Sequence, residues 1–135
     1  MTCPFCAPAL IRDEIRLEND HCLVLQGIEP VLVGSGLIIP KLHRETAFDL
    51  TEIEWIATYK LLHQVKALLD DEYSPQGYNV GWNCGQVGGQ SVFHAHLHVI
   101  PRFEDEPYAG RGIRNWLKRD ANRRLTIRDG YNCQD

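Results

Sequence analysis

Apolar side chains recur at three- and four-residue steps between residues 51 and 70, the period that places them on one face of an α-helix. They are Ile53, Ile56, Ala57, Leu61, Val65, Leu68 and Leu69. Thr51 and Glu54 have the spacing of a capping box, in which each side chain accepts a backbone N–H of the other residue. The stretch Ser74-Pro75-Gln76-Gly77 that follows is typical of a turn. The pattern predicts one long amphipathic helix over residues 51–70.

Shorter apolar runs predict strands, because four to eight such residues between turn signals are typical of a strand. They cover residues 22–26, 31–40 and 78–83. Leu37-Ile38-Ile39 is the clearest part of the second run. Residues 9–19 have no comparable pattern, and we expect a short helix or an irregular approach to the first strand there.

Half of the six histidines lie within one short segment, where His94, His96 and His98 alternate with small or apolar residues. Alternate side chains of an extended strand point to one face, whereas successive rings of this row would be turned by about 200° in a helix. The sequence therefore predicts a strand over about residues 91–100, with the three rings forming the floor of a site. A single histidine is more often a partly buried, hydrogen-bonded residue, but three histidines in register favour a catalytic or metal-binding role.

Two chemistries use such a row: a catalytic metal ion bound by imidazoles, or a covalent nucleophile oriented by its neighbours. The preceding loop contains Gly85, Gly88 and Gly89, and glycines let backbone N–H groups converge on an anion. We expect this loop, followed by Gln90 and Ser91, to bind phosphate beside the histidines. Imidazole suits attack on phosphorus, because it is partly unprotonated near neutral pH and a hydrogen bond at Nδ1 leaves Nε2 free to react.

Composition limits the class of protein. A chain of 135 residues is the size of one domain, and a net charge of −4 argues against the basic surface that binds nucleic-acid polymers. No apolar run approaches the length of a membrane span and no signal-peptide pattern is visible, so we expect a cytoplasmic protein without membrane contact. The five cysteines are then expected to be thiols or metal ligands. Cys3 and Cys6 form a C-x-x-C pair, typical of a redox site or of half a zinc site.

Residues 83–101 resemble the histidine triad family of nucleotide hydrolases and transferases. The resemblance rests on Gly88-Gly89-Gln90-Ser91-Val92 and on the alternating histidine pattern from His94 to Ile100. It extends over the cysteine pair, the strand before His43 and the long helix, and the segment after His98 looks most like bacterial diadenosine polyphosphate hydrolases. The resemblance implies a single α+β domain over residues 1–135: an antiparallel sheet of about five strands, one long helix and a short C-terminal helix around residues 113–118. It also implies a homodimer.

The resemblance further implies a covalent mechanism, in which His96 attacks the α-phosphorus and a nucleotidyl-histidine intermediate is then hydrolysed. The substrate would be a dinucleoside polyphosphate or a nucleoside phosphoramidate. The residues at matching positions around the phosphate are His98, Gln90, Ser91, Asn83 and Gly89. Those that match the wall of the base pocket are Phe5, Ile28 and Leu37. Many members contact the ribose through an acidic or amide residue where this chain has Gly27, and Gln26 beside it is the candidate substitute.

In zinc-bearing members of the family, two N-terminal thiols join two histidines. Carried over, the ligands are Cys3, Cys6, His43 and His94, a set that suits a closed structural zinc site. Whether a divalent cation accompanies the substrate is left open. Two other functions stay possible at this point. One is a metal-dependent hydrolase that uses the histidine row as ligands, and the other is a nucleotide-binding regulatory or scaffold protein with residual activity.

Overall fold

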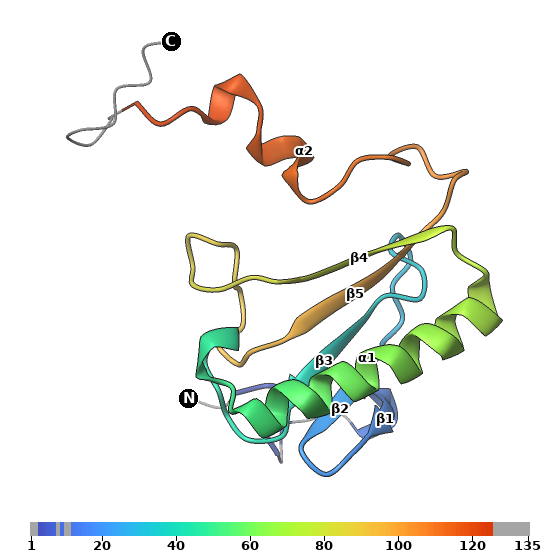
Figure 1. The fold of residues 1–135 in the computed structure, drawn as a ribbon, viewed down its shortest axis with the longest axis vertical. Coiled ribbons are helices and arrows are strands. Elements are labelled where there is room, and N and C mark those ends of the chain that lie inside the picture. The colour runs from blue at the N-terminus through green and yellow to red at the C-terminus, as the bar shows by residue number, and fades with distance from the viewer. Residues whose placement is uncertain (1–2, 8, 10–11, 126–135) are drawn as a thin grey trace.

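Five strands and one long helix make up the core of the domain in the computed structural model, which describes residues 3–7, 9 and 12–125. The strands are β1 (Ile15–Glu18), β2 (Cys22–Leu25), β3 (Gly36–Pro40), β4 (Gly77–Trp82) and β5 (Leu97–Arg102). They form one antiparallel sheet in the order β1-β2-β3-β5-β4, and helix α1 (Glu52–Tyr73) crosses it (Figure 1). The predicted α+β fold, with its five-stranded antiparallel sheet, is confirmed.

Helix α1 begins and ends at residues that satisfy its terminal backbone groups. The Thr51 side chain accepts the Glu54 N–H, and the Glu54 carboxylate accepts the Thr51 N–H at 2.8 Å, so the predicted capping box is present. The helix runs three residues beyond the predicted end at residue 70. Ser74 then takes a left-handed conformation with a φ of 49°, and Pro75 follows, which stops the helix.

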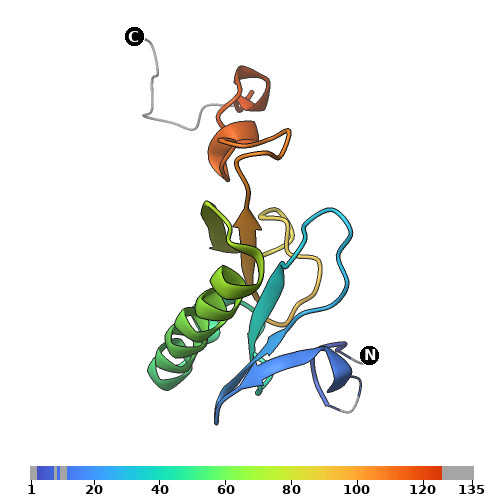
Figure 2. The ribbon, with the colours of Figure 1, turned by 90° about the vertical axis from the view of Figure 1, so that its right-hand side faces the viewer.

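The main hydrophobic core lies between α1 and one face of the sheet. It joins Leu61, Val65 and Leu69 of the helix to strand residues such as Ile38 and Val99. Figure 2 shows α1 on one side of the sheet, with the N-terminal segment and the loop between β2 and β3 on the other. That second face has only a small cluster of buried residues, so it is the face on which a ligand site is accessible.

The histidine segment differs from the predicted strand over residues 91–100, because β5 begins only at Leu97. Before it, the Ala95 N–H donates to the Arg44 carbonyl at 2.7 Å instead of to a neighbouring strand. The His94 ring bonds to the Pro40 carbonyl at 2.8 Å, at the end of β3. Only Gly36 to Ile38 of β3 pair with β5, so residues 91–96 have no strand partner and run as a loop. Strand β1 was not predicted, because its two apolar residues alternate with charged ones and form no continuous apolar run, and we expected a short helix or an irregular approach there.

Beyond β5 the chain leaves the sheet, and its described part up to residue 125 contains short helices. Arg102 anchors this tail by donating to the carbonyls of Arg111 at 2.6 Å and Tyr108 at 2.8 Å. The short C-terminal helix is α2 (Arg114–Leu117), close to the predicted residues 113–118, and it lies away from the sheet (Figure 1). The 3-10 helices are η1 (Arg12–Glu14), η2 (Ala47–Asp49) and η3 (Asp120–Asn122). No helix in the described part of the chain is long and apolar enough to cross a membrane, and the expected cytoplasmic location stays a prediction.

Candidate functional site

Four side chains from three distant segments converge at the N-terminal end of the molecule. The ligand atoms of Cys3, Cys6, His43 and His94 all lie within 4.8 Å of one another. His94 Nδ1 is 3.4 Å from Cys3 Sγ and 3.5 Å from Cys6 Sγ, and His43 Nδ1 is 3.3 Å from Cys6 Sγ. Four tetrahedral ligands of a zinc ion are about 3.3–3.8 Å apart. The predicted set therefore has the donor atoms and the spacing to hold a metal ion.

The second nitrogen of His94 supports this arrangement. His94 is fully buried, and its Nε2 donates to the Pro40 carbonyl at 2.8 Å, which leaves the Nδ1 lone pair facing the two thiols. A metal-ligating histidine usually donates its other N–H to such an oxygen. Burial lowers the pKa of His94 and outweighs the bond to Pro40, so the ring is neutral near pH 7, the form that binds a metal.

His96 is buried and its ring is held in one orientation. Its Nδ1 donates to the His94 carbonyl at 2.8 Å, so the Nε2 lone pair is free of the protein backbone. The Phe5 ring packs edge-on against it, with the centroids 5.4 Å apart. Because Phe5 lies between the two cysteines of the C-x-x-C pair, the metal-ligand group and the His96 ring are linked both through the backbone of His94 and through this contact.

His98 lies beside His96 at the start of β5, and the two ring centroids are 5.0 Å apart. Its Nε2 is buried and has no hydrogen-bond partner among the described residues. Burial, and to a smaller extent His96, lowers the pKa of His98, so the ring is neutral near pH 7. A buried polar atom of this kind normally has a partner, and a bound ligand would supply one.

The glycine loop differs from the predicted cradle of free N–H groups. The N–H groups of Gly88 and Gln90 donate to the Gly85 carbonyl at 3.1 and 3.0 Å, and the Gly89 N–H donates to the Gln86 carbonyl at 3.0 Å. These N–H groups close the turns of the loop itself, so the prediction that they converge on an anion is wrong. A Cβ at Gly88 would lie 2.6 Å from the Cys84 carbonyl oxygen, which explains why glycine is required there.

Gln90 lies at the base of this loop rather than at its surface. It is 3% exposed, and its amide nitrogen donates to the carbonyls of Glu45 at 2.6 Å and Val92 at 3.0 Å. Its amide oxygen accepts the Gly85 N–H at 2.8 Å. Both amide donors are thus occupied, and the side chain holds the loop against the segment after β3. Gln90 therefore positions the loop, and it has no N–H group left for the predicted bond to phosphate.

Ser91 and Asn83 are exposed polar residues of this loop region, as is Gln86. The Asn83 amide lies beside Gly89, since a Cβ at Gly89 would be 3.7 Å from the amide carbon and nitrogen. Gly89 has a φ of 93°, a conformation that side chains with a Cβ rarely adopt. The three predicted residues therefore lie together at the surface, where a ligand can reach them.

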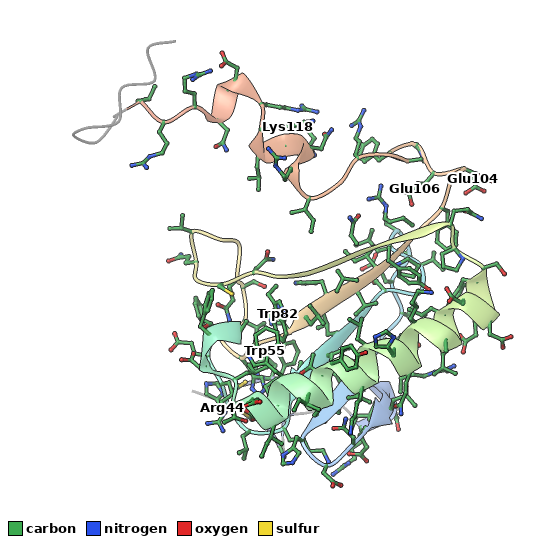
Figure 3. All side chains as sticks on the ribbon, viewed as in Figure 1. Arg44, Trp55, Trp82, Glu104, Glu106 and Lys118 are labelled. Atoms are coloured by element: carbon green, nitrogen blue, oxygen red, sulfur yellow. The ribbon has the colours of Figure 1, made fainter. Side chains whose placement is uncertain are left out.

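An ion pair between Arg44 and Glu54 supports the histidine loop, and the sequence did not predict this pair. The Arg44 carbonyl accepts the Ala95 N–H, and the Arg44 side chain donates to both oxygens of the Glu54 carboxylate at 2.9 and 3.2 Å. Figure 3 shows Arg44 at the start of α1. Burial raises the pKa of Glu54, but the bonds from Thr51 and Arg44 outweigh it, so its pKa lies below the ordinary value. The capping spacing of Glu54 was visible in the sequence, whereas its partner Arg44 was not.

A cavity of about 260 Å³ lies on the same face of the sheet as His98. The register pairs Leu37 of β3 directly with His98 of β5, so the cavity and the histidines are adjacent. Its lining residues are Phe5, Glu14, Leu25, Gly27, Ile28, Glu29, Ser35, Gly36 and Leu37. The three predicted wall residues thus line one cavity. Gln26 does not line it, because its amide donates to the Gly34 carbonyl at 3.1 Å and holds the bend.

Comparisons with known proteins identify the family of this chain. A family model described as HIT domain matches residues 10–105. "Protein hit" of Bacillus subtilis is 36% identical over 86 residues, a match that covers 64% of this chain and 59% of that protein. The match thus spans less than two thirds of that relative. Bis(5'-adenosyl)-triphosphatase of Dictyostelium discoideum is 30% identical over 103 residues, which are 76% of this chain and 69% of that protein.

The fold agrees as well. A crystal structure of a HIT family member from Bacillus subtilis is 32% identical and superimposes with a TM-score of 0.70, over 78% of this chain and 76% of that one. The sequence match, the shared fold and the histidine segment lead to one conclusion: this chain belongs to the HIT family, the histidine triad proteins.

Proposed function

We propose that this chain hydrolyses a nucleotide through a covalent nucleotidyl-histidine intermediate on His96, acting on a dinucleoside polyphosphate or a nucleoside phosphoramidate. The observation that carries the proposal is the bond from His96 Nδ1 to the His94 carbonyl, which leaves the Nε2 lone pair available. The name of the Dictyostelium discoideum relative, a bis(5'-adenosyl)-triphosphatase, supports the same substrate class.

The proposed reaction has two steps, transfer of the nucleotidyl group to His96 and hydrolysis of the intermediate. Nε2 of His96 forms a bond to the α-phosphorus, and the leaving group departs with the electron pair of the cleaved P–O or P–N bond and takes up a proton. Water then attacks the same phosphorus, releases the nucleoside monophosphate and restores the imidazole. The ring carries a positive charge while it is bonded to phosphorus. The His94 carbonyl, which accepts the Nδ1–H, stabilises that charge and keeps the ring in place.

His98 is the second residue of the proposed reaction. Its neutral ring lies next to His96, and its Nε2 would gain a partner in a phosphate oxygen or in the leaving group. Ser91 and Asn83 are the exposed donors that suit the phosphate oxygens. Gln90 acts as a positioning residue, because its amide holds the loop that carries them.

The leaving group has room on the same face of the sheet. A second cavity of about 570 Å³ begins at Ile100 and Arg102, the next residues of β5 that point to the side of His98, and the tail closes it with Tyr108, Arg111 and Trp116. The Arg111 guanidinium lies over the Tyr108 ring at 4.4 Å. Aromatic rings and a guanidinium suit a second nucleoside and its phosphates.

Zinc is the proposed occupant of the group formed by Cys3, Cys6, His43 and His94, where it would act as a structural ion that ties the N-terminal segment to the histidine loop. Within the described residues this is the one group of three or more such side chains that converge, and it contains only His94 of the row. The geometry therefore favours a nucleophilic His96 over a metal ion held jointly by the three histidines.

A homodimer is proposed through the edge strand β4 and the adjoining part of α1. Strand β4 pairs with β5 on one side only, so its other edge is free to pair with a second copy. Trp55 packs against Trp82 with ring centroids 5.4 Å apart (Figure 3). Ile56 and Tyr59 of the same helix are also exposed. Exposed apolar surface next to an open strand edge is typical of an interface.

The experiment incubates the wild-type protein with diadenosine triphosphate and with adenosine 5′-phosphoramidate, quenches in alkali and maps any adenylylated peptide by mass spectrometry. We expect the adduct on His96, and no adduct or turnover in His96→Ala. His21→Ala is the matched control, since His21 is exposed in the turn between β1 and β2. Turnover that persists in a folded His96→Ala protein would show that the nucleophile is wrongly assigned. A wild-type protein that binds these nucleotides but shows neither an adduct nor turnover would instead favour a binding role without chemistry.

A further inference from the structure

One carboxylate in the cavity beside the histidines has no role in the mechanism above. Glu14, the last residue of η1, lies next to Gly27, and both residues line the cavity. A Cβ at Gly27 would lie 3.4 Å from Glu14 Oε1 and 3.8 Å from Oε2. The Glu14 carboxylate therefore occupies the place to which a side chain at position 27 would extend.

The backbone around Glu14 is fixed relative to the cavity. The Glu14 carbonyl accepts the Gln26 N–H at 2.8 Å, next to the pairing of β1 with β2, so the two segments cannot move apart independently. Its carboxylate forms no hydrogen bond or ion pair with the described residues. Two neighbouring polar side chains are engaged in the bend between β2 and β3: one oxygen of Glu29 accepts the N–H of Val31 at 3.0 Å, and Gln26 donates to the Gly34 carbonyl. Both oxygens of the Glu14 carboxylate are thus left to accept from a ligand in this cavity.

We infer that Glu14 binds the 2′- and 3′-hydroxyls of the ribose and makes the site selective for ribonucleotides over 2′-deoxyribonucleotides. The inference rests on the proposed function, because it takes the α-phosphate to be at His96. The base then lies against the apolar wall formed by Phe5, Leu37 and the fully exposed Ile28. The ribose connects the base to the 5′-phosphate, so its hydroxyls face the remaining polar part of the cavity.

Charge supports this orientation of the nucleotide. Glu14 and Glu29 line the part of the cavity near Gly27, and two carboxylates repel a phosphate from that part. The neutral His98, paired with Leu37 across the sheet, lies toward the phosphate end. A carboxylate has two oxygens that accept from two vicinal hydroxyls at once, and hydrogen bonds to a charged acceptor are stronger than neutral ones. Loss of the 2′-hydroxyl removes one of the two bonds.

The test compares matched ribose and deoxyribose compounds. We measure kcat/KM for adenosine 5′-phosphoramidate and for its 2′-deoxy counterpart, and the Kd of AMP and of 2′-deoxy-AMP by calorimetry. In the wild type we expect a preference for the ribose compounds of about ten-fold to a hundred-fold, the value of one hydrogen bond to a charged group. Glu14→Ala should reduce the preference to within about three-fold, and Glu14→Gln should retain part of it, because an amide oxygen still accepts one bond. Asp13→Asn, an equal change of charge on the neighbouring exposed residue, should retain the wild-type ratio.

The outcomes separate this inference from the proposed function. If the adduct forms on His96 but Glu14→Ala keeps the wild-type preference, the role of Glu14 is refuted and the mechanism stands. If no adduct forms on any substrate, the proposed function fails, while the ratio of Kd values for AMP and 2′-deoxy-AMP still reports on Glu14. A wild-type protein that binds the two monophosphates equally, or binds neither, overturns the inference. Equal thermal unfolding midpoints of the variants exclude misfolding as the cause.

Discussion

The pair formed by Arg44 and Glu54 leads to a prediction about both stability and its dependence on pH. Glu54 is 3% exposed, and its carboxylate accepts the Thr51 N–H and the Arg44 Nε–H. Glu54→Gln keeps the size of the side chain but removes the charge, and its new amide donors face the donors of Arg44. Breaking a buried ion pair costs about 3–5 kcal/mol. The Arg44 side chain is 30% exposed and regains water, so we expect the free energy of unfolding to fall by about 2 kcal/mol.

The pH dependence follows from the lowered pKa of Glu54. A group whose pKa is lower in the folded state stabilises the protein above its unfolded pKa, about 4.3 for glutamate. This contribution is lost as the pH falls through the folded value. The difference in unfolding free energy between the wild type and Glu54→Gln should therefore be largest near pH 7 and become smaller below about pH 4.

The assay is urea denaturation followed by tryptophan fluorescence at equal protein concentrations, at pH 7 and at pH 4 and below. Glu52→Gln is the control, because Glu52 is exposed in the first turn of the same helix, and it should change the free energy of unfolding by about 0.5 kcal/mol or less. If Glu54→Gln costs no more than this control at pH 7, or if the difference is the same at both pH values, the stabilising role assigned to the buried pair is refuted.

Three further predictions concern the metal group, the core and the interface. Cys6→Ser should lower the zinc content, measured by atomic absorption, from about one ion per chain toward zero, because it removes one of four ligands; an unchanged content would refute the ligand set. Leu61→Ala, at a fully buried position, should lower the free energy of unfolding by about 2–5 kcal/mol in guanidinium denaturation, and a loss below 1 kcal/mol would argue against the core. Val80→Lys on the edge strand β4 should shift the protein from dimer to monomer in analytical ultracentrifugation, and an unchanged dimer would exclude this edge.

Local patterns in the sequence determined the main elements and the chemical groups of the site. The spacing of apolar residues over residues 51–70 predicted α1, because helix geometry alone decides which side chains share a face. The run Leu37-Ile38-Ile39 predicted the buried strand β3, because a short run of apolar residues between turn signals is typical of a strand. The donor set of Cys3, Cys6, His43 and His94 was expected from a resemblance, and these four side chains do converge, while zinc binding itself stays a prediction.

Only the tertiary structure decided which partner each polar group has. The amide of Gln90, expected at the phosphate, donates to the carbonyls of Val92 and Glu45, and the Glu45 carbonyl becomes its neighbour only when the loop packs against the segment after β3. Gln26, the expected ribose contact, turns toward Gly34, and Glu14 occupies the place beside Gly27 instead. The periodicity of a sequence describes which side chains share a face of one element. The partner of a polar side chain comes from a different element, so it is determined by how the elements pack together.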